Sequence, residues 1–141
     1  MNIFLANSFK QIKLGDLGVA CSLDSQSNHA SPVKSPIDND IGNMVNSNKV
    51  GTPFYLAPEI WNDKPYSMKS DMWALGVSLY ELCTKQKPFI AENMDSLHAV
   101  IMNGAPRDMD RVLKISRDLH DIVLQLLRKN LDSRPSIIEL L

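Results

Sequence analysis

The sequence predicts a mostly helical fold with one small β-hairpin, an α+β class, and three patterns support this prediction. Alternating apolar residues near the start are typical of two short strands, at 2–5 and 11–14, joined by a turn at 7–10. A run that Asp71 opens is apolar on most sides, as in a buried helix. Further along, apolar residues recur at helical spacing in two more segments.

The helix after Asp71 leaves only a thin polar stripe, so we expect it to be buried nearly all round until Lys87-Pro88 ends it. The stripe consists of Asp71, Ser78 and Glu81.

Three more helices complete the expected fold. The first carries Met94, Leu97, Val100 and Ile101 at helical spacing, and Gly104 predicts its end. In the second, Ser116 is the expected N-cap of an amphipathic stripe formed by Leu119, Ile122, Val123, Leu126 and Leu127. For the last helix, Pro135 is suited to the first turn.

Composition limits the function classes. The length of 141 residues suits one domain, and 15 basic against 16 acidic residues leave no basic patch for nucleic acid. We expect Cys21 and Cys83 to be idle or buried thiols, and His29, His98 and His120 to be surface imidazoles without metal-ligand spacing. No apolar run has the length of a membrane span or the form of a secretory leader, so we expect an intracellular protein, in cytoplasm or nucleus.

Residues 22–49 separate the hairpin from the helices. Ser, Asn and Asp make up 14 of these 28 residues, and no strand or helix period is present. We therefore expect a long, mobile loop, which in a compact domain is usually functional or disordered.

Four short motifs follow one another along the chain. They are Asp16-Leu17-Gly18, the stretch 51–59, Asp71, and Arg134-Pro135. Asp16 lies between two glycines just after a strand, where its carboxylate could reach a magnesium ion, which prefers one or two carboxylates. Taken alone, this triplet would be an ordinary turn after a strand.

The order of these motifs resembles the C-terminal part of a serine/threonine protein kinase domain. Asp16-Leu17-Gly18 is similar to the magnesium-binding triplet, and Gly51-Thr52-Pro53-Phe54-Tyr55-Leu56-Ala57-Pro58-Glu59 to the substrate-docking end of the activation segment. Details of residues 2–5, 13–18 and 51–60 are most similar to the NIMA-related kinases. The resemblance implies a kinase-like large lobe over residues 1–141, with 22–49 as an activation-segment insert longer than is usual in the family.

The resemblance also implies ATP and Mg²⁺ as cofactors, protein substrates, and roles for individual residues. Asn2 and Asp16 would hold magnesium, and Phe4 would lie beneath the adenine ring. Thr52 would position the acceptor hydroxyl, which the 53–56 loop would seat. Structural roles would fall to three further residues, with Glu59 and Arg134 forming a buried ion pair and Asp71 anchoring the catalytic loop.

Several parts of a working kinase have no counterpart in the 141 residues. There is no glycine-rich loop, no strand Lys with a helix Glu partner, and no His-Arg-Asp ahead of Asn2. We therefore expect a fragment that lacks the small lobe and the catalytic base, is inactive alone, and has its small lobe encoded upstream. The alternative is a catalytically inactive kinase-like binding or scaffold module. A purely helical interaction domain would require the motif order to be a coincidence.

Three serines of the insert are candidate phosphorylation sites. Ser31 and Ser35 each precede a proline, and Ser47 is the hydroxyl nearest to position 48. In the family, activating phosphorylation usually falls at that position, but here it is Asn48. For the Ser-Pro steps we favour the simpler interpretation of two turns in a mobile loop.

Overall fold

The computed structural model describes residues 2–15, 53–109 and 115–141. Its elements, in chain order, are β1 (Asn2–Ala6), β2 (Gln11–Gly15), the 3₁₀ helix η2 (Pro53–Tyr55), α2 (Pro58–Trp61), α3 (Met68–Thr84), α4 (Met94–Asn103), α5 (Arg117–Leu126) and α6 (Ile137–Leu140). This mostly helical arrangement with a two-stranded antiparallel sheet confirms the predicted fold class. The insert at 22–49 lies outside the described residues.

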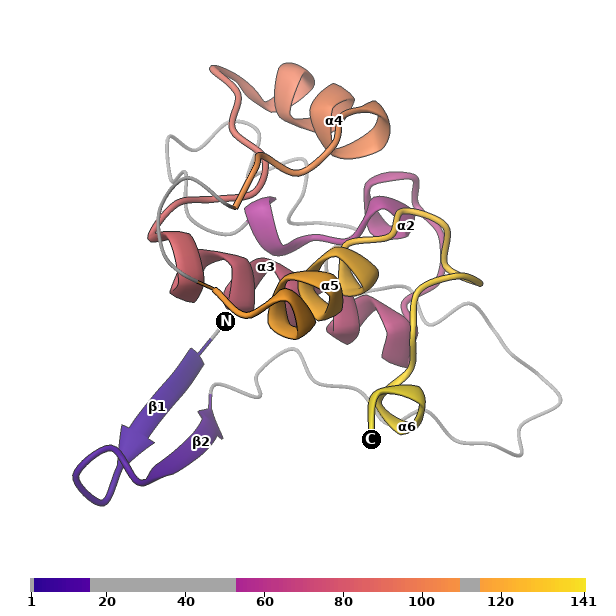
Figure 1. The fold of residues 1–141 in the computed structure, drawn as a ribbon. Coiled ribbons are helices and arrows are strands. Elements are labelled where there is room, and N and C mark those ends of the chain that lie inside the picture. Colours follow the sequence, from indigo (N-terminus) through magenta and orange to yellow (C-terminus); the bar gives the residue numbers. More distant parts are fainter. Residues whose placement is uncertain (1, 16–52, 110–114) are drawn as a thin grey trace, which may run out of the picture.

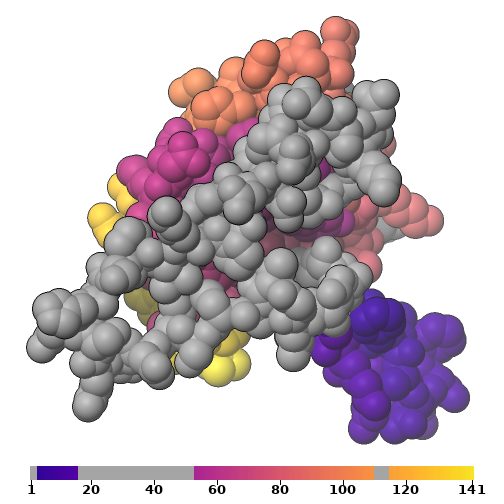
Figure 2. All heavy atoms as spheres, turned by 180° about the vertical axis from the view of Figure 1, so that it is seen from behind, coloured from indigo at the N-terminus to yellow at the C-terminus, as the bar shows by residue number. Residues whose placement is uncertain are grey.

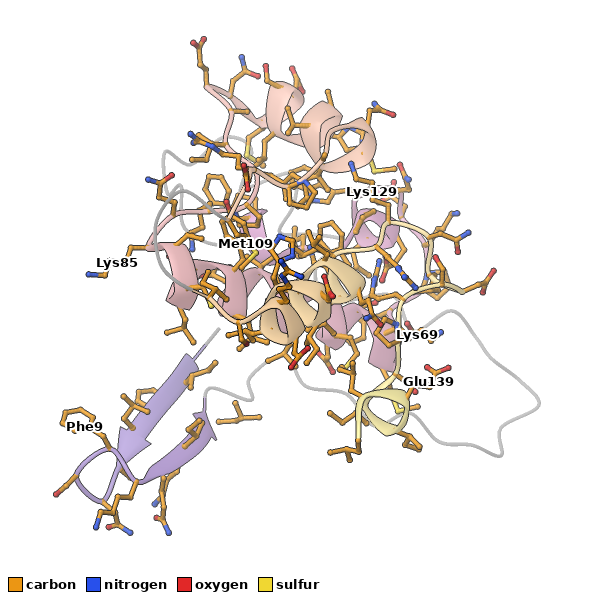
Figure 3. All side chains as sticks on the ribbon, viewed as in Figure 1. Phe9, Lys69, Lys85, Met109, Lys129 and Glu139 are labelled. Atoms are coloured by element: carbon orange, nitrogen blue, oxygen red, sulfur yellow. The ribbon has the colours of Figure 1, made fainter. Side chains whose placement is uncertain are left out.

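The predicted hairpin is present, with each strand one residue longer than expected. Ile3 pairs with Leu14 and Leu5 with Ile12, so these four apolar side chains share one face of the ribbon. The hairpin stands apart from the helices (Figures 1 and 2), and Phe9 lies at its tip (Figure 3). Its side chains are largely exposed because no described helix covers either face.

Helix α3 runs through the middle of the helical part and contributes three side chains to the hydrophobic core (Figure 1). Trp73, Val77 and Tyr80 are fully buried on it, where α5 and η2 pack against it. Gly76 permits the close approach of α5, because a Cβ at this position would lie 2.7 Å from the Cβ of Leu126. The core therefore depends on a crossing of two helices that are distant in sequence.

The expectation that α3 is buried on nearly every side is wrong for the described residues. Leu82 is 71% exposed, since α5 and η2 cover only part of the helix. Ser78, expected on the polar stripe, is instead buried, and its hydroxyl donates to the Ala74 carbonyl at 2.9 Å. The helix also ends at Thr84, before Lys87-Pro88, because Lys85 adopts a left-handed conformation with φ 57°.

Helix termini show which capping predictions hold. Ser116 accepts a hydrogen bond from the Leu119 amide and Gly104 ends α4, both as predicted. Pro135, by contrast, precedes the last helix. Ser136 is the N-cap there and forms a capping box with Glu139. Pro135 therefore lies just before the N-cap and not in the first turn, because the Ser136 side chain caps the helix.

The prediction of a surface imidazole is wrong for His98. Its ring stacks on Trp61 with centroids 5.4 Å apart, and its Nε2 atom is buried without a hydrogen-bond partner in the described part of the chain. Helices α2 and α4 pack here, so the ring fills the space between them. Of the other residues in this group, Cys83 is a half-buried free thiol and His120 lies beside Asp121, whereas Cys21 and His29 lie outside the described residues.

Candidate functional site

The candidate site is the segment from Pro53 to Glu59, which the 3₁₀ helix η2 opens and α2 closes. The Leu56 amide donates to the Pro53 carbonyl at 3.2 Å, which closes the η2 turn. Pro58 occupies the first turn of α2, where its missing N–H costs no helical hydrogen bond. These local features begin α2 and place Glu59 in the core.

Glu59 forms a two-pronged ion pair with Arg134, a residue 75 positions away in the sequence. Nη1 of Arg134 donates to Oε1 of Glu59 at 2.8 Å, and Nη2 donates to Oε2 at 2.9 Å. The Arg134 side chain is 0% exposed and that of Glu59 is 4% exposed. The predicted buried pair is therefore confirmed, with the fork geometry that makes such pairs strong.

Other groups complete this network. Arg134 also donates to the carbonyls of Lys69 at 2.7 Å and Arg128 at 2.9 Å, and its guanidinium lies 5.2 Å from the centre of the Trp73 ring. Glu59 accepts a further hydrogen bond from the Ser70 hydroxyl at 2.8 Å. The pair thus connects α2, the start of α3 and the segment before α6.

The charge of Glu59 is maintained despite its burial. Burial alone raises the pKa of this carboxyl group, because an ionised oxygen loses its water. Hydrogen bonds from Arg134, the backbone and Ser70 oppose this effect and together lower the pKa below its ordinary value of 4.5. At neutral pH the pair is therefore ionised and fully hydrogen-bonded.

A second polar cluster lies at the other end of α3 and was not predicted. The Tyr55 hydroxyl donates to Oε2 of Glu81 at 2.6 Å, and Lys87 Nζ donates to the same oxygen at 2.6 Å. In the sequence, Glu81 was only one residue of a polar stripe, and no short-range pattern connects it with Tyr55 or Lys87.

Asp71 lies in the first turn of α3, as predicted. Its carboxylate is exposed and accepts a hydrogen bond from the Tyr66 hydroxyl. This position suits the positive end of the helix dipole. The predicted contact with a catalytic loop involves a segment that the described residues do not contain, so that role stays a prediction.

The end of the hairpin is the predicted nucleotide side of the site. In the strand register Asn2 pairs with Gly15, which sets Asn2 beside the residue that precedes Asp16. The Phe4 ring covers Gly15 so closely that a Cβ there would lie 2.7 Å from Cε2, yet the ring is 55% exposed. The hairpin therefore offers an accessible aromatic ring beside Gly15.

Several predicted site residues lie outside the described part of the chain. They are the side chains of Asn2, Asp16 and Thr52 and the candidate phosphorylation sites Ser31, Ser35 and Ser47. Their roles stay predictions. Within the described residues, no group of three or more His, Cys, Asp or Glu side chains could hold a metal ion, and no helix is both long and apolar enough to cross a membrane.

Comparison with known proteins identifies the family. The family model for the protein kinase domain matches residues 1–141. The serine/threonine-protein kinase Nek5 of Mus musculus is 36% identical over 140 residues, which are 99% of this chain and 20% of the relative. Nek4 and Nek1 of Mus musculus are 34% and 38% identical, also over 99% of this chain, and their matched parts are 15% and 10% of their lengths.

The chain thus spans a fifth or less of the length of these relatives. The match nevertheless runs along the whole sequence, and the buried Glu59–Arg134 pair expected from the motifs is present. The chain therefore belongs to the protein kinase domain family and is similar to the NIMA-related (Nek) serine/threonine kinases.

Proposed function

We propose that this chain forms the large lobe of a serine/threonine kinase that transfers the γ-phosphoryl group of ATP to a Ser or Thr hydroxyl of a protein. The observation that carries the proposal is the buried, two-pronged pair of Glu59 and Arg134. It fixes the end of the 53–59 segment to α3, as an acceptor-docking loop requires. The names of the Nek relatives, all serine/threonine-protein kinases, support the same activity.

On the acceptor side, Thr52 would hold the substrate hydroxyl and the 53–56 loop would seat the residues around it. Phosphoryl transfer depends mainly on positioning and on neutralisation of charge, so a rigid loop is a large part of what a protein can contribute. Pro53 is buried and residues 54–56 are half-buried, which leaves this loop partly accessible to a peptide. Asp71 would position the backbone of the catalytic loop.

On the nucleotide side, the residues fit ATP with magnesium. Asn2 and Asp16 would hold the ion, and an amide with a carboxylate agrees with the few protein ligands that magnesium prefers. The Asn2–Gly15 pairing supports this assignment, because it sets Asn2 beside the residue that precedes Asp16 in the sequence. When bound, magnesium neutralises phosphate charge. Phe4 would contribute an exposed aromatic face to the adenine ring.

We further propose that the 141 residues alone do not transfer phosphate. The sequence contains no glycine-rich loop, no paired strand Lys and no catalytic Asp. Water would then reach Asn2, Asp16 and Phe4 and would weaken every charge interaction there. The second candidate function, a kinase-like binding module without activity, is favoured by the same missing motifs.

The test compares this chain with a longer product, if a complete transcript encodes one upstream of Met1. Binding of magnesium-ATP is measured by calorimetry, and phosphate transfer to casein by a radiolabel assay. We expect transfer only from the longer product and its loss in Asp16→Ala. Transfer by the 141-residue chain, abolished by Asp16→Ala, would show that the proposed inactivity is wrong. A longer product without nucleotide binding would exclude the kinase function and favour the binding module.

A further inference from the structure

Lys87 lies where the candidate acceptor loop meets the C-terminal end of α3. Lys85 marks this end of the helix, opposite Lys69 at its start (Figure 3). The Lys87 ammonium donates to Oε2 of Glu81 at 2.6 Å and to the hydroxyl of Tyr55. Because Tyr55 donates to the same carboxylate oxygen at 2.6 Å, the three groups form a closed cluster.

The same ammonium also contacts the aromatic rings of the loop. Lys87 Nζ lies 4.1 Å from the centre of the Tyr55 ring and 6.0 Å from that of Phe54. Both distances are within the range of cation–π attraction. One lysine side chain, 23% exposed, therefore contacts two consecutive residues of the loop and the helix behind them.

We propose that Lys87 is a positioning residue for the acceptor loop. It holds Phe54 and Tyr55 against the end of α3 before any substrate arrives. The inference deepens the proposed function and rests on it, since only a kinase would use this segment as an acceptor loop.

The loop needs this second point of attachment because the first lies at its far end. Glu59 and Arg134 fix the chain at residue 59, whereas Tyr55, in the described part of the chain, is held by η2 packing and by the cluster with Glu81 and Lys87. A loop already fixed in its bound shape loses less conformational entropy when a peptide binds. A loose loop would instead be ordered by each substrate, at a cost in affinity.

Lys87 adds a charge to the contact between Tyr55 and Glu81. A carboxylate and a phenol can share one hydrogen bond, and the ammonium adds a counter-ion that contacts both groups. Burial raises the pKa of the Glu81 carboxyl, and hydrogen bonds from Lys87 and Tyr55 outweigh this so that the pKa is lowered. The ammonium thus favours the ionised form of Glu81, which is the acceptor for Tyr55.

The first test measures hydrogen exchange of the Leu56 amide in the 141-residue chain. That amide donates to the Pro53 carbonyl and reports on the η2 turn. We expect Lys87→Ala to speed its exchange about tenfold, since charge-assisted hydrogen bonds are lost, with no change at Val77 inside α3. Lys87→Arg should restore much of the protection, and Lys64→Ala, an exposed lysine beside α2, should have no effect.

The second test follows the ionisation of Tyr55 by nuclear magnetic resonance of ¹³C-labelled tyrosine. Burial and the Glu81 hydrogen bond raise the pKa of Tyr55, whereas Lys87 lowers it. We therefore expect Lys87→Ala to raise the Tyr55 pKa further and Glu81→Gln to lower it. This titration reports the contact between Lys87 and the Tyr55 hydroxyl, on which the inference depends.

Three results would overturn the inference. In the first, Lys87→Ala leaves the exchange rate of the Leu56 amide equal to that of the unmodified chain. In the second, Lys87→Ala speeds exchange equally at Leu56 and Val77. In the third, the Tyr55 pKa is the same in Lys87→Ala as in the unmodified chain. None of these results contradicts the proposed kinase function. A failure of the longer product to transfer phosphate contradicts the proposed function itself, and the proposed role of Lys87 at the acceptor loop would then be wrong as well.

Discussion

Replacement of Arg134 by alanine tests the central packing of this chain, because it leaves a buried carboxylate without its partner. Within the described residues, the Arg134 side chain makes four hydrogen bonds, two to Glu59 and one each to the carbonyls of Lys69 and Arg128. Removal of one member of such a buried pair costs about 3–5 kcal/mol. A domain of this kind is stabilised by only about 5–15 kcal/mol, so the variant should be close to unfolding.

Urea unfolding, followed by tryptophan fluorescence, measures this loss. The Trp73 ring lies 5.2 Å from the guanidinium and should report the change directly. At about 2–4 °C per kcal/mol for a chain of this size, the midpoint of thermal unfolding should fall by about 6–20 °C. The urea midpoint should fall without a change in the slope m, provided that unfolding remains two-state.

The matched control is Arg117→Ala, which removes an exposed arginine from the start of α5. We expect its free energy of unfolding to stay within about 0.5 kcal/mol of the unmodified chain. The double variant Glu59→Leu with Arg134→Met should recover part of the loss, because neither charge is then buried alone. If Arg134→Ala cost less than about 1 kcal/mol, as for a surface ion pair, our account of this network would be refuted.

Three further predictions concern pH, packing and capping. The folded-state pKa of Glu59 is lowered from 4.5, so the stability that ionised Glu59 contributes is present above pH 4.5 and should be lost as the pH falls through the folded-state pKa. Urea unfolding measured from pH 6 to 3 should show this loss, and Glu59→Gln should make the pH dependence flatter. Gly76→Ala should cost about 1–3 kcal/mol by calorimetry, since its methyl group would collide with Leu126; an unchanged midpoint would contradict this packing. Ser116→Ala should lower the free energy of unfolding by about 1 kcal/mol, whereas Ser116→Asn, which keeps a capping side chain, should leave it nearly unchanged; thermal unfolding measures both.

Local patterns predicted the secondary structure well. The hairpin follows from alternation of apolar residues, and the end of α4 and start of α5 follow from Gly104 and Ser116. Each of these features depends on residues within a few positions of one another. The prediction was wrong at Pro135, where two nearby residues compete for the helix start and the side-chain cap of Ser136 decides it.

Of the two polar clusters at the candidate site, the sequence predicted one and not the other. The Glu59–Arg134 pair was expected only because the motif order resembles a kinase, since nothing local connects residues 75 positions apart. The cluster at Lys87 was missed altogether. Its three members are ordinary residue types, and only the packing of η2 against α3 brings Tyr55 to the end of that helix.

The amino-acid sequence by itself determined the fold class, the main helix and strand positions and the kinase motifs, since these depend on local periodicity, capping and short sequence motifs. Tertiary structure decided which face of α3 is buried, that His98 stacks on Trp61, and that Lys87 joins Tyr55 to Glu81. The physical reason is the distance along the sequence over which each kind of interaction acts. Helix and turn preferences act over a few residues, whereas burial and charge pairing depend on segments that meet only after the chain has folded.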